Sequence, residues 1–173
     1  VSTHYKSNLI KKYFGNGKKW NINIKYLEEK KPLGTAGSLQ LIPKSDIKLP
    51  VLVINGDVLT NVNFKKLIKS HIKKNVAATI CVREESVKSE FGVVRIKNSY
   101  LDKIDEKPVN KFLINAGIYV INIKKISKIT KNTYIDMTTL LNNMVAKKNK
   151  INIYYLYEEW QDIGHINEYK KAI

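Results

Sequence analysis

Two aspartates in this sequence have surroundings that suit a metal site. Asp57 follows the run Val51-Leu52-Val53-Ile54, which is typical of a strand buried on both faces. Asp162 lies in Trp160-Gln161-Asp162-Ile163-Gly164, between an expected strand and an expected helix. Open α/β sheets bind ligands at the carboxyl edge of their strands, and Mg²⁺ usually takes one or two carboxylates plus phosphate oxygens. The pair predicts a magnesium site; a turn residue is the alternative for Asp57, and a helix cap for Asp162.

A loop with two glycines precedes the first of these aspartates. The segment Pro32-Leu33-Gly34-Thr35-Ala36-Gly37-Ser38-Leu39 follows an expected strand and opens an expected helix. Glycines let a backbone come close to a ligand, and free N–H groups at a helix start suit anions or the acceptor edges of a base. The loop is therefore a candidate ligand site. A plain strand-to-helix turn with Thr35 as its cap explains the same residues equally well.

Small and polar residues interrupt two later apolar runs. Asn115 and Gly117 lie inside the run from Ile114 to Tyr119, and Gly92 opens another run of this kind. Such residues weaken a strand unless something approaches the backbone closely. These positions are therefore candidates for contact with a ligand.

A charged turn lies between these two runs in the chain. In Asp105-Glu106-Lys107-Pro108, the Glu106 carboxylate could accept hydrogen bonds from sugar hydroxyls, and the Lys107 ammonium could neutralise a phosphate. Taken alone, an ordinary solvated turn is the simpler explanation of this segment.

The histidines and the cysteine carry no recognisable site. His4, His71 and His165 lack metal-ligand spacing, and His71 falls on the apolar face of an expected helix. Cys81 has no neighbour that would activate a thiol nucleophile, and as the single cysteine it cannot form an internal disulfide. We assign these four residues no chemical role and expect a cytoplasmic protein.

Apolar runs of strand length alternate with amphipathic stretches along the whole chain, which is the pattern of an α/β domain around a mostly parallel sheet. The sequence has no internal repeat and no linker, so we expect a single domain over residues 1–173. Strands are expected at 21–27, 50–54, 76–82, 112–121 and 151–157, a hairpin at 92–96 and 101–104 around Asn98 and Ser99, and helices at 63–75, at 136–146 and from about 167.

The formal charge of +16 raises the question of nucleic-acid binding. Only Arg83 and Arg95 are arginines, and the remaining positive charges are lysines spread along the chain. Because base reading favours the guanidinium fork, a solvated lysine surface explains the charge better than a nucleic-acid groove. No apolar run is long enough to span a bilayer, so neither a nucleic-acid nor a membrane partner is expected.

Read together and in order, the motifs resemble the sugar nucleotidyltransferase family. The order is more specific than any single motif, and the similarity covers essentially the whole chain. It is closest to members like mannose-1-phosphate guanylyltransferase, including those that make nucleotide-activated amino sugars for nonulosonic (legionaminic) acid synthesis. The motifs are Pro32 to Gly37, Asn55 to Asp57, Phe91-Gly92-Val93-Val94, Glu106-Lys107-Pro108, Asn115 to Val120 and Trp160 to Gly164.

The resemblance implies a Rossmann-like three-layer domain with a mostly parallel mixed sheet, in which an oxygen of a sugar 1-phosphate attacks the α-phosphate of a nucleoside triphosphate and pyrophosphate leaves. Catalysis in such a domain is positioning plus charge neutralisation. Asp57 and Asp162 would hold Mg²⁺ between the reacting phosphates. The nucleotide base and ribose would lie against Leu33, Gly34 and Gly37, a motif that leans toward guanine.

The resemblance also implies a sugar site. Lys107 would meet the sugar phosphate, and Trp160 would help to wall the pocket. The sugar hydroxyls would contact Gly92, Glu106, Asn115 and Gly117.

One departure from the family pattern changes the expectation for this polypeptide. The family's glycine-rich signature belongs to a first strand and loop that the sequence does not contain, and Val1 to Tyr5 resembles the end of the second strand. We expect the polypeptide alone to be nearly inactive, because the transferring phosphate loses most of its electrostatic clamp. An uncovered sheet edge would favour a homo-oligomer. The alternatives are a non-catalytic regulatory or assembly subunit that binds a nucleotide sugar, and a lysine-driven RNA-binding module.

Overall fold

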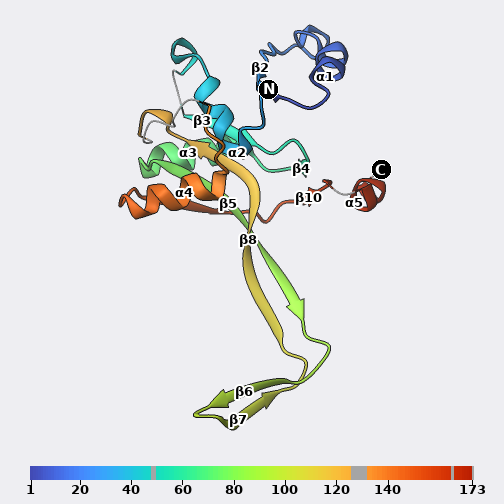
Figure 1. Cartoon of the computed structure of the whole chain (residues 1–173), viewed down its shortest axis with the longest axis vertical. Helices are drawn as coiled ribbons and strands as arrows, with labels where there is room; N and C mark the ends of the chain where they lie inside the picture. Colours follow the sequence, from blue (N-terminus) through green and yellow to red (C-terminus); the bar gives the residue numbers. More distant parts are fainter. Residues whose placement is uncertain (48–49, 126–131, 165, 173) are drawn as a thin grey trace. The chain divides into compact units, whose positions relative to one another are not determined.

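The computed structural model describes residues 1–47, 50–125, 132–164 and 166–172 (Figure 1). The chain forms two compact units, each made of three segments. The first unit comprises residues 1–53, 68–79 and 120–152, and the second comprises residues 54–67, 80–119 and 153–173. Both units contain helices and strands, which confirms the α/β class. No helix within the described ranges is long and apolar enough to cross a membrane.

The N-terminal part of the first unit differs from the sequence prediction. Strand β1 (Ser2–Thr3) pairs in parallel with β2 (Leu27–Glu28), with Ser2 opposite Leu27, and helix α1 (Ser7–Phe14) lies between them in the chain. The strand expected at 21–27 is wrong apart from its last residue, because a 3₁₀ helix η1 (Lys18–Trp20) precedes a stretch without regular structure. The Gly17 carbonyl accepts the Ile22 N–H and the Asn16 carbonyl accepts the Ile24 N–H, two groups that a strand would need for its own pairing.

The core of the first unit packs short helices against one long helix. Helix α4 (Met137–Ala146) begins after Asp136 as expected and contacts α2 (Gly34–Gly37), which continues into the 3₁₀ helix η2 (Ser38–Leu41). Two further 3₁₀ turns, η3 (Lys44–Asp46) and η4 (Ile123–Lys125), complete the unit. Its buried apolar side chains include Leu33, Ala36, Leu39, Met137, Leu140, Leu141 and Met144.

Helix α3 (Phe64–Lys74) confirms the helix predicted at 63–75. The Lys66 N–H donates to the Asn63 side-chain carbonyl at 3.0 Å, so Asn63 is the N-cap, as the sequence indicates. His71 is only 2% exposed, and its Nδ1 lies 2.9 Å from the equally buried Thr79 hydroxyl. Burial, and to a lesser extent the Lys125 charge, lower the pKa of His71. This histidine is a neutral core residue.

The buried His71 predicts a pH dependence of stability. Its folded-state pKa lies below that of the unfolded chain, so as the pH falls below about 6.5 the unfolded state takes up a proton that the folded state refuses. The free energy of unfolding should therefore decrease on acidification, by at most about 1.4 kcal/mol for each pH unit, and show no His71 contribution at higher pH. Urea unfolding of the wild-type chain and of His71→Gln between pH 5 and 8 gives the free energy of unfolding of each protein as a function of pH. Equal pH slopes for the two proteins would contradict the prediction.

The central sheet has the strand order β3-β8-β5-β9, with β3 (Val51–Ile54), β8 (Val109–Ile121), β5 (Ala78–Lys88) and β9 (Ile151–Tyr155). Each strand contributes residues to both units. All four confirm predicted strands, but β5 and β8 run beyond the predicted ends. Apart from the half-buried Arg83, the additional residues are exposed, and none of them follows an apolar pattern. They include the ion pair of Lys111 with Glu84 at 2.8 Å, so hydropathy could not indicate them.

The second unit adds two antiparallel strand pairs and the last helix. Strands β6 (Val93–Lys97) and β7 (Tyr100–Asp105) form the predicted hairpin, in which Asn98 and Ser99 both have positive φ as a type I′ turn requires (Figure 1). No strand is expected from the sequence between Asp57 and the helix at 63–75, but strand β4 (Val58–Thr60) lies there and pairs with β10 (Trp160–Asp162). Helix α5 (Ile166–Ala172) follows.

Candidate functional site

The two aspartates singled out in the sequence are neighbours in the second unit. The pairing of β4 with β10 places Val58 opposite Asp162, and the Ile163 N–H donates to the Asp57 carbonyl at 2.8 Å. A Cβ atom added to Gly164 would lie 3.0 Å from Asp162 Oδ1 and 3.1 Å from Asp57 Oδ2. Both carboxylates therefore crowd the Cα atom of Gly164, and the absence of a side chain there keeps the space between them open.

The Asp57 carboxylate lacks the partners that a buried oxygen normally has. Its Oδ1 is buried and accepts no hydrogen bond from the described residues, and no described lysine or arginine forms an ion pair with Asp57 or Asp162. Among the described residues, Asp162 Oδ1 accepts one hydrogen bond, from the Gly164 N–H at 2.8 Å. Leaving a buried carboxylate oxygen unpaired beside a second acid is unfavourable. A cation placed between these oxygens would remove that cost.

The donor set fits Mg²⁺ better than a transition metal. Within the described ranges no group of three or more histidine, cysteine, aspartate or glutamate side chains could enclose a metal ion. A hard cation that takes two protein carboxylates and completes its shell with water and phosphate oxygens needs no larger group. Asp57 and Asp162 are therefore the residues that could hold magnesium.

Strand β8 brings Asn115 and Gly117 beside the Asp57 turn. The Asn55 N–H donates to the Gly117 carbonyl at 2.9 Å, and the Gly117 N–H donates to Asn115 Oδ1 at 3.1 Å. Gly117 has a φ of +68°, and a Cβ atom there would lie 2.8 Å from Asn55 Nδ2. Glycine is required at 117 by backbone conformation and by this close approach.

Trp160 is held in place on both sides. Its indole N–H donates to the Ala116 carbonyl at 2.8 Å, while an Arg83 N–H donates to the Trp160 carbonyl at 2.7 Å. The Arg83 guanidinium also lies 5.8 Å from the centre of the indole ring, within reach of a cation–π interaction. Trp160 and Arg83 line a cavity of about 1050 Å³ together with Leu59, Thr60, Tyr155 and Glu159.

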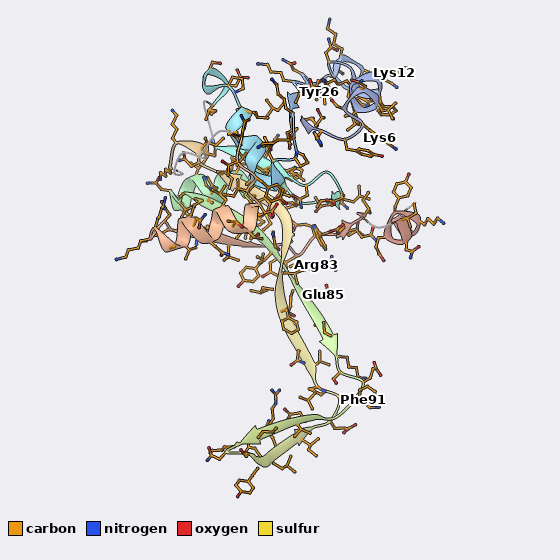
Figure 2. All side chains as sticks on the ribbon, viewed as in Figure 1. Lys6, Lys12, Tyr26, Arg83, Glu85 and Phe91 are labelled. Atoms are coloured by element: carbon orange, nitrogen blue, oxygen red, sulfur yellow. The ribbon has the colours of Figure 1, made fainter. Side chains whose placement is uncertain are left out.

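Arg83 is the residue that sequence reasoning missed. It lies on β5 (Figure 2), far from Trp160 in the sequence, and its one signal was that arginine is rare in this chain. Both arginines are engaged within the protein, since Arg95 Nε lies 3.0 Å from Asp105 Oδ2.

Gly92 and Glu106 meet at the base of the β6–β7 hairpin. A Cβ atom at Gly92 would lie 3.0 Å from Glu106 Oε2 and 3.0 Å from Ile104 Cγ2. Lys107 follows with a φ of 44° and makes no ion pair with the described residues. Gly92 and Glu106 therefore lie side by side, and Lys107 follows Glu106 directly in the chain.

The left-handed backbone of Lys107 predicts that glycine is tolerated at this position. A non-glycine residue in this conformation costs roughly 1 kcal/mol, and a following proline disfavours it further. Lys107→Gly should therefore leave the free energy of unfolding unchanged or raise it by up to about 1 kcal/mol. Urea unfolding of the variant and of wild type measures this difference; a variant clearly less stable than wild type would show that the Lys107 side chain contributes to the fold.

The loop with two glycines, in the first unit, differs from the sequence interpretation in one respect. Its N–H groups are not free: those of Ala36 and Gly37 donate to the Ile135 carbonyl, and that of Thr35 donates to Asp136. The Leu33 N–H donates to the Glu29 carboxylate at 2.9 Å. The Thr35 hydroxyl accepts the Met137 N–H at 2.8 Å, so Thr35 caps α4 rather than α2.

The glycines of this loop allow close packing against the segment 133–136. Gly34 has a φ of +75°, and a Cβ atom there would lie 2.7 Å from the Ile135 carbonyl oxygen. At Gly37 a Cβ atom would lie 2.8 Å from that of Leu33, which is itself buried. Any ligand contact of these residues would therefore be made by backbone atoms.

The structure gives Cys81 no chemical role. The thiol is fully buried, and burial together with the Glu158 charge raises its pKa to about 12. His4 is exposed and its Nδ1 lies 2.8 Å from the Glu29 carbonyl oxygen, while His165 lies outside the described residues.

A family model described as "Nucleotidyl transferase" matches residues 1–173. The chain belongs to the nucleotidyl transferase family. Among curated members, it is 34% identical over 169 residues to the mannose-1-phosphate guanyltransferase of Aspergillus oryzae, covering 92% of this chain and 45% of that protein. It is 29% identical over 175 residues to the D-glycero-alpha-D-manno-heptose 1-phosphate guanylyltransferase of Aneurinibacillus thermoaerophilus, covering 99% and 75% of the two chains.

A solved structure supports the nucleotidyl transferase fold. HddC from Yersinia pseudotuberculosis, complexed with GMP-PN, matches with a TM-score of 0.71 at 22% identity, over 98% of this chain and 74% of that one. This nucleotidyl transferase chain spans about half the length of the fungal relatives it matches.

Proposed function

We propose that the chain is part of a sugar-1-phosphate guanylyltransferase, which transfers GMP from GTP to a sugar 1-phosphate. A phosphate oxygen of the sugar 1-phosphate bonds to the α-phosphorus of GTP, the bond from that phosphorus to the bridging oxygen breaks, and pyrophosphate leaves. The observation that carries the proposal is the pair of carboxylates, Asp57 and Asp162, around Gly164. The buried Asp57 Oδ1 of this pair has no hydrogen-bond partner among the described residues. The names of the two curated relatives support the choice of guanine and of a sugar 1-phosphate.

The two aspartates would hold Mg²⁺, which when bound neutralises charge on the reacting phosphates. The protein fixes their positions through the backbone: Ile163 donates to the Asp57 carbonyl, and Gly164 donates to the Asp162 carboxylate. Preorganised groups of this kind lower the barrier because they need no reorganisation during the reaction. Asp57 and Asp162 are thus proposed as catalytic residues.

The sugar side of the proposal uses two groups of residues. Lys107 would neutralise the sugar phosphate, and Glu106, with Gly92 beside it, would accept hydrogen bonds from the sugar hydroxyls. Asn115 Oδ1 already accepts one hydrogen bond, from Gly117, and has a second lone pair for a hydroxyl. The Trp160 ring would form an apolar wall of the site. Its hydrogen bond to the Ala116 carbonyl keeps the ring in one orientation.

On the nucleotide side, we propose that the base and ribose lie on the backbone of Leu33, Gly34 and Gly37. Gly34 is half-buried and Gly37 is buried, and both pack closely against the segment 133–136. Contact with the nucleotide would therefore be made by backbone atoms, while the buried Leu33 side chain anchors the loop. We also propose that the enzyme binds no nucleic acid, since both arginines are engaged within the protein. We further propose that it acts in the cytoplasm.

The test is pyrophosphate release by the complete gene product, measured with each nucleoside triphosphate against a panel of sugar 1-phosphates, with Mg²⁺ and with EDTA. Activity with GTP and one sugar phosphate that requires Mg²⁺ is the expected result. A folded protein that binds a nucleotide sugar but releases no pyrophosphate with any pair would overturn the proposal in favour of a regulatory subunit.

A further inference from the structure

Strand β10 has a strand partner on only one of its edges, where it forms a two-stranded sheet with β4. The Asn61 N–H donates to the Glu159 carbonyl at 3.1 Å, and the Ile163 N–H donates to the Asp57 carbonyl at 2.8 Å. Because the backbone groups of successive residues in a strand point to opposite edges, residues 159, 161 and 163 bond to the β4 side. The carbonyl of Trp160 therefore points to the other edge.

This outward carbonyl accepts its hydrogen bond from Arg83. The distance from Arg83 Nη1 to the Trp160 carbonyl oxygen is 2.7 Å, which is typical of a hydrogen bond with a charged donor. Such bonds are roughly twice as strong as those between neutral groups. For β10, the Arg83 side chain thus takes the place of a second neighbouring strand.

The charge of Arg83 is directed at Trp160 and not at an acid. No ion pair within the described ranges includes Arg83, although Glu158 and Glu159 line the same cavity. The guanidinium lies 5.8 Å from the centre of the indole ring, so it interacts with both the backbone and the side chain of Trp160. A half-buried arginine that holds one residue in two ways fixes the position and the orientation of that residue.

Trp160 links this restraint to the proposed sugar site. Its indole N–H donates to the Ala116 carbonyl on β8 at 2.8 Å, and Ala116 is fully buried. Ala116 lies between Asn115 and Gly117, which are joined by the hydrogen bond from the Gly117 N–H to Asn115 Oδ1. A displacement of Trp160 would therefore disturb the two residues of β8 that are proposed to contact the sugar.

Strand β10 links the same restraint to the proposed metal site. Asp162 follows Trp160 by two residues in this strand, so the two side chains lie on the same face. Among the described residues, Asp162 Oδ1 accepts one hydrogen bond, from Gly164, so the strand backbone largely sets where the carboxylate lies. Loss of a group that orients a metal ligand typically lowers metal affinity about 10–100-fold.

We propose that Arg83 is a positioning residue, which holds β10 so that Asp162 and Trp160 keep the places that the metal and the sugar 1-phosphate require. This inference rests on the proposed function. It adds a residue that acts through Trp160 and not directly on a substrate.

Titration of the complete gene product with Mg²⁺, followed by calorimetry, tests the proposal. Arg83→Met keeps an unbranched side chain but has neither the donor nor the charge, and its Mg²⁺ affinity should be about tenfold weaker than that of wild type. Arg83→Lys keeps the charge and a donor, so it should lose less, about threefold. Arg95→Met is the matched control, because that arginine pairs with Asp105 in the hairpin, and it should bind Mg²⁺ like wild type.

The indole N–H of Trp160 gives a second readout that requires no metal. In protein labelled with ¹⁵N-tryptophan, the resonance of this group is the one that Trp160→Phe removes. Its hydrogen exchange should be faster in Arg83→Met by about tenfold, because the ring is held less firmly against the Ala116 carbonyl. Arg95→Met should leave the exchange rate unchanged.

The outcomes separate this inference from the proposed function. If wild type binds Mg²⁺ but Arg83→Met and Arg83→Lys bind it equally well, Arg83 is not a positioning residue and the proposed function stands. Equal losses in Arg83→Met and Arg95→Met would also overturn the inference, because they would reflect a general loss of stability. A folded wild type that binds no Mg²⁺ would overturn the proposed function, and the inference with it.

Discussion

Replacing Asp57 with asparagine is expected to lower the rate of pyrophosphate release by about 10³-fold while stabilising the protein in metal-free buffer. Asp57 Oδ1 is buried without a hydrogen-bond partner among the described residues, and Asp57 Oδ2 and Asp162 Oδ1 both crowd Gly164. Asparagine removes one negative charge and adds an N–H donor, so the unfavourable pairing of two carboxylates disappears. The same substitution removes half of the proposed magnesium site.

The order of the melting temperatures of Asp57→Asn and wild type should reverse as Mg²⁺ is added. In EDTA, Asp57→Asn should melt about 2–4 °C above wild type, which corresponds to roughly 1 kcal/mol for a chain of this size. With saturating Mg²⁺ the order should reverse, because a ligand stabilises the protein that binds it. The control is Asp102→Asn, which removes an exposed acid from strand β7. This variant should melt like wild type in both buffers. A variant that melts below wild type in EDTA would show that Asp57 is a structural residue and not a metal ligand.

Adding one methyl group at Gly164 should weaken Mg²⁺ binding about 10–100-fold without unfolding the protein. The new Cβ atom would lie 3.0 Å from Asp162 Oδ1 and 3.1 Å from Asp57 Oδ2, closer than ordinary contacts, so both carboxylates would have to move. Gly164 does not need a left-handed backbone, and alanine keeps the N–H that donates to Asp162. The melting temperature should therefore change little in EDTA.

Gly56→Ala is the matched control for this substitution, because a Cβ atom there would have no neighbour within 4 Å. Titration with Mg²⁺, followed by calorimetry or by the rise in melting temperature, compares both variants with wild type. Gly56→Ala should retain wild-type affinity. If Gly164→Ala binds Mg²⁺ as tightly as wild type, the metal does not lie between these two carboxylates.

Patterns within a few residues predicted most elements of this fold. Helix α3 has a periodic apolar face and the Asn63 cap, and the β6–β7 hairpin has Asn98 and Ser99 between two apolar runs. Both signals depend on neighbours in the sequence, so they needed no knowledge of the rest of the fold. The polar ends of β5 and β8 carry no such signal, because their pairing depends on hydrogen bonds to each other.

Contacts between distant segments account for what the sequence could not predict. The alternation at residues 21–27 favours a strand, but the Gly17 and Asn16 carbonyls accept the N–H groups of Ile22 and Ile24. The loop amides of Ala36 and Gly37 are occupied by the Ile135 carbonyl, about a hundred residues away in the chain. Asp57 and Asp162 were recognisable one by one from their motifs, whereas Arg83 became apparent only once β5 placed it beside Trp160.

The path of the chain through the two compact units limits how this protein can be divided or recombined. Each of the four strands of the central sheet begins in one unit and ends in the other, and helix α3 does the same. Neither unit is one continuous stretch of the chain, and a cut at any of their boundaries would divide a strand of the central sheet or helix α3. Neither unit can therefore be expressed alone by truncation at one position.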